Sequence, residues 1–395
     1  IYGIDYHMTG MLWGKILRSP HAHAKIKSID ASKALALAGV HAVITGKDMA
    51  VATDLEVEAG ETSLNYMHLS DNVMARDKSL YKGHAVAAVA ADTQHIAEEA
   101  LALIDVDYEV LTPVLNGREG MKPDAPLIHP NQTTKIMAYR FDPGTDSGEK
   151  SNVAGKSQLK LGDIDAGFAE ADFIVEGEFT TSWVHQGYIE AQNATAHWNN
   201  DGNITVWNSS QGTFNQRQLM AEILKHPVSQ IKMVPQEIGG GFGGKIPVYL
   251  EAPAAMLSKK TGHPVKMTMS RTEVFEGTGP ASAAQMKAKI GATKDGRITA
   301  AYAELVFEAG AFPGSAVGAG AQGMFTTYNI ENILIDGYDV VVNKPKSAAY
   351  RSPGTPQACF PAEALIDELV EKIGMDSLDF RIKNAAKEGD RRADG

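Results

Sequence analysis

The stretch Gly239-Gly240-Gly241-Phe242-Gly243-Gly244-Lys245 lies between a predicted strand over 231–234 and a predicted helix over 248–259. Five of its seven residues are glycine, and a glycine loses more backbone freedom on folding than any other residue. Such density is typical of a tight turn, or of backbone that lies close against an anionic group. A strand, a glycine loop, a helix and a further strand over 265–269 together predict α/β packing.

Three glycines of the run, Gly239, Gly241 and Gly244, satisfy the dinucleotide fingerprint G-x-G-x-x-G. Arg271, after the next predicted strand, would suit the 2′-phosphate of NADP. Against this, Pro247 stands where the helix should begin. An NADP-dependent dehydrogenase that uses the loop of residues 239–244 is therefore one alternative function.

The same run also begins a phosphate loop, G-x-x-x-x-G-K, in which the next residue should be Ser or Thr to hold magnesium. Ile246 occupies that place. The sequence therefore disfavours a nucleoside triphosphatase.

The composition of the 395-residue chain is that of a globular protein. Hydrophobic residues make up 44% and charged residues 22%, and the formal net charge is −11. This acidic balance argues against nucleic-acid binding, which needs basic stripes. The sequence contains no apolar run of about 18 residues, so no membrane span is predicted.

Cys359 is the only cysteine of the sequence. An internal disulfide and an iron–sulfur cluster held by this chain alone are therefore excluded, and a reducing, cytoplasmic location is expected. Residues 1–5 show no signal-peptide pattern. Because the sequence begins with Ile1 and not with Met, we expect a fragment or a processed product.

The predicted elements divide the chain into three regions. Residues 1–115 alternate strands and helices and predict a small α/β domain. Residues 116–158 are rich in turn-forming residues and predict an extended connector. Residues 159–395 predict a larger mixed-sheet domain, so the fold class is α/β (α+β). Strands are expected at 12–17, 25–29, 40–44, 85–91, 105–110, 173–181, 191–198, 204–208, 285–294 and 298–308, and helices at 32–38, 93–104, 163–171, 214–224 and 362–372.

Several segments, in order along the chain, resemble the molybdenum hydroxylases, the family of xanthine dehydrogenase and aldehyde oxidase. The first segments resemble the small α/β hammerhead domain of that family, and they are RSPHAHAKI at 18–26, GVHAV at 39–43 and YKGHAVA at 81–87. The later ones resemble its molybdopterin-binding region, and they are GDIDAGF at 162–168, VEG at 175–177, the glycine run and AYRSPGTPQ at 349–357. The resemblance thus implies a hammerhead domain over 1–115 and a first molybdopterin-binding domain over 159–395.

The resemblance implies a molybdenum cofactor as well. Its pyranopterin would be molybdopterin or the cytosine dinucleotide of molybdopterin, and the reaction would hydroxylate an electron-poor carbon with oxygen from water. Two electrons would leave through iron–sulfur and flavin (FAD) partners. The protein itself would supply hydrogen bonds instead of direct metal ligands.

The position of each residue in the family's motifs implies its role. Gln211 would donate its side-chain amide to an oxo ligand of the molybdenum. Phe242 and Arg351 would approach the metal mainly through their backbone, and Lys245 is expected to form a salt bridge. Glu190 resembles a family Glu near the active-site wall, although a structural carboxylate is the favoured interpretation. The expected cofactor-binding residues are Gln211, Gly240, Gly241, Phe242, Gly243, Gly244 and Arg351.

Three departures from the family pattern bear on the substrate. Xanthine-type members carry a Glu where Ile246 stands, an Arg where Ala319 stands, and an aromatic residue where Pro353 stands. A purine would lose these contacts, so an aldehyde or another N-heterocyclic or aromatic substrate is expected in a pocket that includes Ile246 and Pro353. Carbon monoxide dehydrogenases carry a Cys where Ser352 stands, so their chemistry is disfavoured.

The family's catalytic general base, a Glu, is expected beyond Gly395, so no catalytic residue is predicted on this chain. A second molybdopterin-binding half would come from a partner or from a missing part of the same protein. We expect an oligomeric complex with iron–sulfur and flavin subunits and a small-molecule substrate. A non-catalytic structural subunit with the same fold is the remaining alternative.

Overall fold

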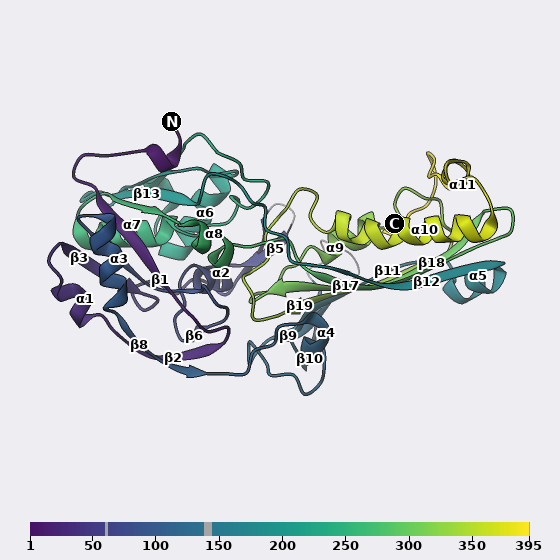
Figure 1. Cartoon of the computed structure of the whole chain (residues 1–395), viewed down its shortest axis with the longest axis horizontal. Helices are drawn as coiled ribbons and strands as arrows, with labels where there is room; N and C mark the ends of the chain where they lie inside the picture. The colour runs from purple at the N-terminus through teal and green to yellow at the C-terminus, as the bar shows by residue number, and fades with distance from the viewer. Residues whose placement is uncertain (60–61, 138–143, 395) are drawn as a thin grey trace. The chain divides into compact units, whose positions relative to one another are not determined.

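The computed structural model describes residues 1–59, 62–137 and 144–394. Within it the chain forms two compact units, each assembled from three segments (Figure 1). Unit 1 consists of Ile1–Pro113, His185–Pro280 and Asn343–Arg351, and unit 2 of Val114–Val184, Ala281–Val342 and Ser352–Gly395. No helix in the described part of the chain is long and apolar enough to span a membrane.

Unit 1 is built on a seven-stranded mixed sheet with the order β15-β14-β13-β16-β1-β7-β3. The strands are β1 (Leu12–Arg18), β3 (Val40–Thr45), β7 (Ala85–Ala91), β13 (Asn193–Trp198), β14 (Ile204–Asn208), β15 (Ile231–Pro235) and β16 (Val265–Thr268). A three-stranded sheet holds β2 (Ala24–Asp30), β6 (Lys78–Ser79) and β8 (Asp105–Val110), and β4 (Glu56–Ala59) pairs with β5 (Thr62–Asn65). The helices are α1 (Ser32–Ala36), α2 (Tyr66–Val73), α3 (Gln94–Ala102), α6 (Thr213–Leu224), α7 (Glu251–Thr261) and α8 (Arg271–Gly277).

Strand pairing joins segments of unit 1 that were predicted to lie in separate domains. β1 pairs in parallel with β16 and antiparallel with β7. The boundaries predicted at 115 and 158 therefore do not coincide with the boundaries of the two compact units. The sequence could not show this, because pairing between distant strands leaves no local sequence signal. All residues of β7 are buried, which explains why its sequence is an unbroken apolar run.

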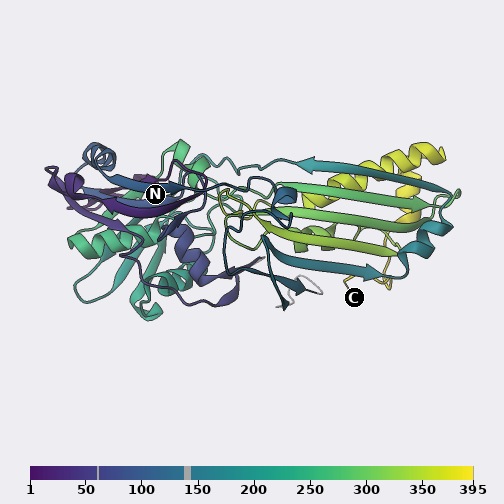
Figure 2. The ribbon, with the colours of Figure 1, turned by 90° about the horizontal axis from the view of Figure 1, so that it is seen from below.

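Unit 2 is built on a second mixed sheet, whose long strands lie side by side in Figure 2. Its order is β10-β9-β11-β19-β18-β17-β12. The strands are β9 (Thr133–Met137), β10 (Thr145–Lys150), β11 (Val153–Leu161), β12 (Phe173–Thr181), β17 (Ala284–Ala292), β18 (Ile298–Gly310) and β19 (Ile333–Val341). The helices are α4 (Gly117–Gly120), α5 (Ile164–Glu170), α9 (Val317–Gly323), α10 (Thr355–Ile373) and α11 (Ser377–Asn384).

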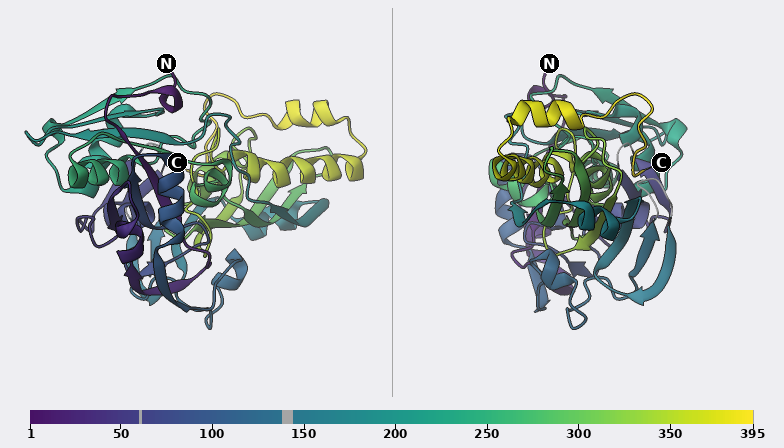
Figure 3. Two further views of the ribbon diagram at one scale, coloured as in Figure 1. Left: turned by 60° about the vertical axis from the view of Figure 1, so that its left-hand side comes forward. Right: turned by 90° about the vertical axis from the view of Figure 1, so that its right-hand side faces the viewer.

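Helix α10 packs along β12 and β17 and is drawn in yellow (Figures 1 and 3). Its buried residues Leu365, Ile366 and Leu369 join Phe307 of β18 in the core of unit 2. The mixed sheets and the helices that cover them confirm the predicted α/β (α+β) class.

The extended connector predicted over 116–158 was wrong for much of that range. Residues 117–120 form α4, and β9, β10 and most of β11 are strands of the second sheet. Their turn-rich sequence does not show strand alternation clearly. For the edge strand β10 the reason is that all its residues are exposed, and an exposed strand needs no apolar face.

Candidate cofactor-binding site

The glycine run lies where several strands of unit 1 reach the same edge of the sheet. β14 and β15 are parallel, and Asn208 pairs with Pro235 where both strands end. β13 runs antiparallel to β14, so its start, Asn193, lies at that edge too. The segments that follow β14 and β15 and the segment that precedes β13 therefore meet at this edge of the sheet. Among them are Gln211 and the glycine run, a placement typical of ligand sites in sheets with parallel strands.

The backbone of the run turns sharply and leaves one large side chain outside. Gly240, Phe242 and Gly243 have φ of 89°, 52° and 104°. A positive φ is unusual for a residue with a Cβ, and the Phe242 side chain is 53% exposed. The structure thus presents this ring on the surface of unit 1 and does not use it in the core.

The glycines allow the run to approach other parts of the same unit. A Cβ on Gly241 would lie 2.4 Å from Oε1 of Gln211, and one on Gly243 would lie 2.2 Å from the backbone oxygen of Ala349. Neither contact is sterically possible. Close packing on the protein's own chain, and not only on a ligand, therefore explains why residues without a Cβ stand at these positions.

Gln211 is held against the run by its side-chain oxygen. Oε1 accepts the backbone N–H of Gly243 at 2.8 Å and that of Lys245 at 3.2 Å. The backbone N–H of Gln211 donates to the carbonyl of Lys245 at 3.1 Å. Two N–H donors identify Oε1 as the inward atom, so Nε2 is the outward one. Gln211 is exposed, and within residues 1–59, 62–137 and 144–394 its Nε2 has no hydrogen-bond acceptor.

Arg351 reaches the run through its backbone, because its N–H donates to the carbonyl of Phe242 at 3.2 Å. Its side chain is exposed and meets no partner among the described residues. The N–H groups of Gly240, Gly241 and Phe242 likewise have no acceptor in the part of the chain that the structure describes. A group of free N–H donors on a tightly turned backbone is suited to an electron-rich ligand.

The two expected substrate-pocket residues lie in different units. Ile246 is half-buried in unit 1, and its N–H donates to the carbonyl of Gly243 at 3.3 Å. Pro353 belongs to unit 2. The pocket that would combine them stays a prediction.

Beneath the run lies a buried ion pair that joins Lys245 to Glu190. Nζ and Oε2 are 2.8 Å apart, and the two side chains are 0% and 5% exposed. This confirms the salt bridge predicted for Lys245. Its partner lies 55 residues earlier, and the sequence alone could not identify it.

The carboxylate of this pair is the better stabilised partner. Burial alone would raise the pKa of Glu190, but the hydrogen bonds from Lys245 and the Gly239 N–H outweigh it and lower that pKa. Burial lowers the pKa of Lys245, and the bond to Glu190 opposes this shift. The lowered pKa of Glu190 favours its charged form, whereas the lowered pKa of Lys245 favours its neutral form. We take the pair as charged, because both oxygens of the carboxylate receive donors.

Buried amides hold the far side of the run. Gln216 Nε2 donates to the carbonyls of Lys245, Ile246 and Pro247, at 3.3, 3.3 and 3.0 Å. Gln192 Nε2 donates to the carbonyl of Gly244 at 2.8 Å. Sequence reasoning missed both residues, since a lone Gln gives no signal of what it contacts.

The dinucleotide alternative does not fit this topology. A dinucleotide fold needs the strands on either side of the glycine loop and helix to be parallel neighbours. Here β14 and β13 lie between β15 and β16. Arg271, the expected phosphate ligand, donates instead to the carbonyls of Tyr188 and Ile189, at 2.9 and 2.6 Å.

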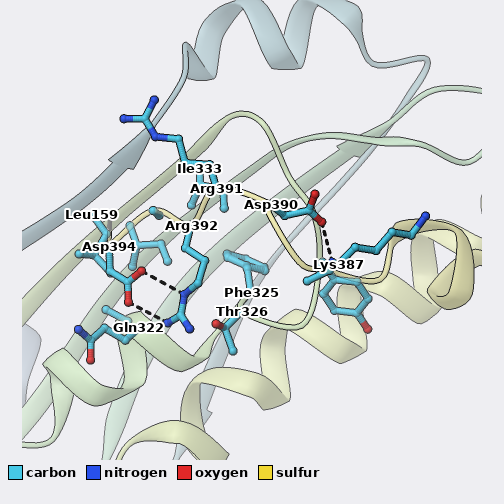
Figure 4. Close-up of a pocket in the computed structure, with 15 residues that line it drawn as sticks. Leu159, Gln322, Phe325, Thr326, Ile333, Lys387, Asp390, Arg391, Arg392 and Asp394 are labelled. Carbon is cyan, nitrogen blue, oxygen red and sulfur yellow. Dashed lines mark hydrogen bonds and ion pairs between the residues drawn. The ribbon is translucent and has the colours of Figure 1, made fainter.

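A cavity of ≈ 90 Å³ lies in unit 2 (Figure 4). None of the predicted site residues is among the residues that line it. Phe325 and Ile333 line it beside the polar side chains of Arg392 and Asp394. Arg392 donates two hydrogen bonds to Asp394, at 3.1 and 2.8 Å. Arg392 and Asp394 thus neutralise each other at this cavity.

Two family models match the sequence of this chain. Residues 145–385 match the family model of the molybdopterin cofactor-binding domain. Residues 1–112 match that of the aldehyde oxidase and xanthine dehydrogenase a/b hammerhead domain. The chain is 32% identical to the nicotinate dehydrogenase large molybdopterin subunit of Eubacterium barkeri, over 100% of this chain and 87% of that subunit.

Two solved structures share the fold over nearly the whole chain. Aldehyde oxidoreductase from Desulfovibrio gigas gives a TM-score of 0.86 at 29% identity, over 100% of this chain and 42% of its own. Quinoline 2-oxidoreductase from Pseudomonas putida 86 gives 0.85 at 25% identity, over 98% of this chain and 48% of its own. The chain thus spans less than half of the length of each of these two chains. Together, the two matched domains and these likenesses show that the chain belongs to the xanthine dehydrogenase and aldehyde oxidase family of molybdenum hydroxylases.

Proposed function

We propose that this chain forms one side of the molybdenum-cofactor site in a hydroxylase of an aldehyde or of an N-heterocyclic or aromatic compound. The observation that carries the proposal is the orientation of Gln211. Two backbone N–H groups of the glycine run hold its Oε1, so its Nε2 donor faces outward. The cofactor, when bound, would supply the oxidation of the substrate with oxygen from water.

The donors around Gln211 fit such a cofactor. The N–H groups of Gly240 and Phe242, which have no acceptor among the described residues, and the exposed side chain of Arg351 add further hydrogen-bond donors. A pyranopterin and the oxygen ligands of molybdenum are rich in acceptors. The role of this chain would be to hold and orient the cofactor, while Phe242 covers one flank of the site.

The proposed substrate class rests on the departures from xanthine-type members. Ile246 offers no carboxylate to a purine, and a buried heteroatom without its partner loses about 1–3 kcal/mol. Some relatives carry names of this class, a nicotinate dehydrogenase, a quinoline oxidoreductase and an aldehyde oxidoreductase, while others are named as probable xanthine dehydrogenase and hypoxanthine oxidase, so the proposed class rests on the residues. Ser352 disfavours the chemistry of carbon monoxide dehydrogenase.

The remaining parts of the enzyme would come from elsewhere. We propose that a second molybdopterin-binding segment completes the cradle and supplies the general base, on a partner or on the same polypeptide. Iron–sulfur and flavin partners would accept the electrons, and the complex would work in the cytoplasm. The pterin would be molybdopterin or its cytosine dinucleotide.

Metal analysis of the native complex tests this proposal. We expect about one molybdenum per copy of this chain, together with pterin fluorescence after denaturation. A complex without molybdenum would contradict the proposal and favour a structural subunit. Turnover assays with nicotinate, quinoline, benzaldehyde and xanthine would then test the substrate class, and xanthine as the best substrate would contradict it.

A further inference from the structure

One oxygen atom of Glu190 joins the two ends of the glycine run. Oε2 accepts the backbone N–H of Gly239 at 2.8 Å and the Nζ of Lys245 at 2.8 Å. Gly239 is the first residue of the run and Lys245 the last. The loop between them is therefore closed by a single buried atom.

The surroundings fix that carboxylate in place. Its other oxygen, Oε1, accepts Nδ2 of Asn193 at 3.1 Å. The ammonium of Lys245 also contacts Oγ of Ser209 at 3.4 Å and lies 5.2 Å from the ring centre of Tyr188. A buried ion pair is favourable only when such bonds satisfy its remaining atoms, and these contacts hold both side chains where they lie.

The ion pair is linked to the donors at the surface through the main chain of Lys245. Its N–H donates to Oε1 of Gln211, and its carbonyl accepts the N–H of Gln211. Displacing Lys245 would therefore displace Gln211 at two points. A buried pair often adds little net stability over apolar residues of similar size, so stability alone does not account for charges at this place.

We propose that Glu190 and Lys245 are positioning residues that set the shape of the glycine run and thereby aim the Gln211 amide at the cofactor. This inference rests on the proposed function. Neither side chain reaches the surface where the cofactor would lie, since both are buried. They act through Gly239, Lys245 and Gln211.

The test separates positioning from stability with a neutral double variant in the native complex. Glu190→Gln alone leaves the Lys245 charge buried without its partner, so we expect a lower melting temperature and less molybdenum per chain. In Glu190→Gln/Lys245→Met no buried charge is unpaired, and the melting temperature should recover. Because the run is no longer tied at both ends, turnover per bound molybdenum should stay roughly tenfold below that of the wild type.

Glu190→Asp provides a second test if the double variant does not fold. It keeps the charge but is one methylene shorter, so it cannot reach Gly239 and Lys245 together, and the same loss of turnover per molybdenum is expected. The control is Glu273→Gln, which breaks the pair with Arg18 elsewhere in unit 1. That variant should lower the melting temperature while molybdenum content and turnover per molybdenum stay at the wild-type values.

The outcomes distinguish the two proposals. Absence of molybdenum from the wild-type complex would overturn the proposed function and this inference with it. If the wild type holds molybdenum and a folded double variant or Glu190→Asp matches its turnover per molybdenum, the ion pair is structural only. In that case the positioning role is overturned and the proposed function stands.

Discussion

The side-chain oxygen of Gln211 lies 2.8 Å from the backbone nitrogen of Gly243, and it accepts a hydrogen bond from it. These residues are 32 positions apart and follow two adjacent parallel strands, β14 and β15. The bond makes the amide part of the glycine run, with its NH2 group turned outward. The oxygen of this side chain thus holds the glycine run, and its NH2 group is available for binding a ligand.

The two halves of Gln211 can be separated by mutation. Gln211→Glu keeps an acceptor for Gly243 and Lys245 but removes the outward donor, so the fold should persist while turnover per molybdenum falls by about 100-fold. Gln211→Ala removes both halves and should also lower the melting temperature. Steady-state kinetics with metal analysis measures this, and wild-type turnover in Gln211→Glu would refute the donor role.

Gly243→Ala tests the close packing of the run. The new Cβ would meet the carbonyl oxygen of Ala349 at 2.2 Å, in a residue with a φ of 104°. We expect the free energy of unfolding to fall by more than about 2 kcal/mol, together with a lower molybdenum content.

The matched control for this change is Gly262→Ala. Gly262 also has a positive φ, 72°, but no nearby atom of the described residues lies within 4 Å of the added Cβ. Its loss should be near 1 kcal/mol, the ordinary cost of a left-handed backbone for alanine. Equal losses in urea unfolding of the two variants would show that the contact with Ala349 is not limiting.

A buried histidine predicts how unit 1 responds to acid. His84 Nδ1 accepts the N–H of Leu80 at 3.2 Å, and Nε2 donates to the carbonyl of Asp71 at 2.7 Å. Burial lowers the pKa of His84 to about 4 against the effect of the Asp71 carbonyl, and the charge of Arg18 lowers it further. The neutral ring is therefore the form that the fold stabilises.

The sign of the effect follows from the lowered pKa of His84. Its contribution to stability is fully present above the unfolded value of about 6.5 and is lost as the pH falls toward 4. Between pH 7.5 and pH 5 the free energy of unfolding should drop by about 2 kcal/mol through this residue. Denaturant titrations of the wild type and His84→Gln at both pH values measure it. The same pH dependence in both would exclude His84 as the cause.

The parts of the fold that could be predicted are those whose burial decides the sequence pattern. The strand expected at 85–91 coincides with β7, because a strand buried on both faces needs an unbroken apolar run. Helix α9 was missed, since the sequence VGAGAQG reads as a loop. In the structure α9 packs on α10, where Gly320 lies against Ala358.

Helix α10 begins at Thr355, although the sequence predicted a start at 362. Pro361 lies inside the helix, and a proline there normally marks a boundary. Here Pro356 occupies the first turn, where its missing N–H costs nothing, and the helix continues through Pro361 with Pro361 and Ala362 buried.

The order of the motifs was enough to select Gln211, Phe242 and Arg351 as candidate site residues. In the structure Gln211 and Arg351 both contact the glycine run, which contains Phe242. It could not reveal Glu190 as the partner of Lys245 or Gln216 beneath the run. These contacts depend on which strands are neighbours in the sheet, and that information is spread over the whole chain.

Gln216 offers the last test of how the run is supported. Its Nε2 donates to three successive carbonyls, those of residues 245–247, and its Oε1 accepts Nδ2 of Asn208 at 2.8 Å. The side chain is 1% exposed, so Gln216→Leu would fill the same space but remove this donor from the three carbonyls. The carbonyl of Lys245 would keep the N–H of Gln211 as a donor.

Unsatisfied buried acceptors should lower the free energy of unfolding of Gln216→Leu by about 1–3 kcal/mol. Gln158→Leu, at an exposed position of β11, serves as the control and should stay within about 0.5 kcal/mol of the wild type. Because the carbonyl of Lys245 also accepts the N–H of Gln211, molybdenum content should fall in Gln216→Leu but not in Gln158→Leu. A stable Gln216→Leu variant with full molybdenum would mean that Glu190 and Gln192 hold the run without Gln216.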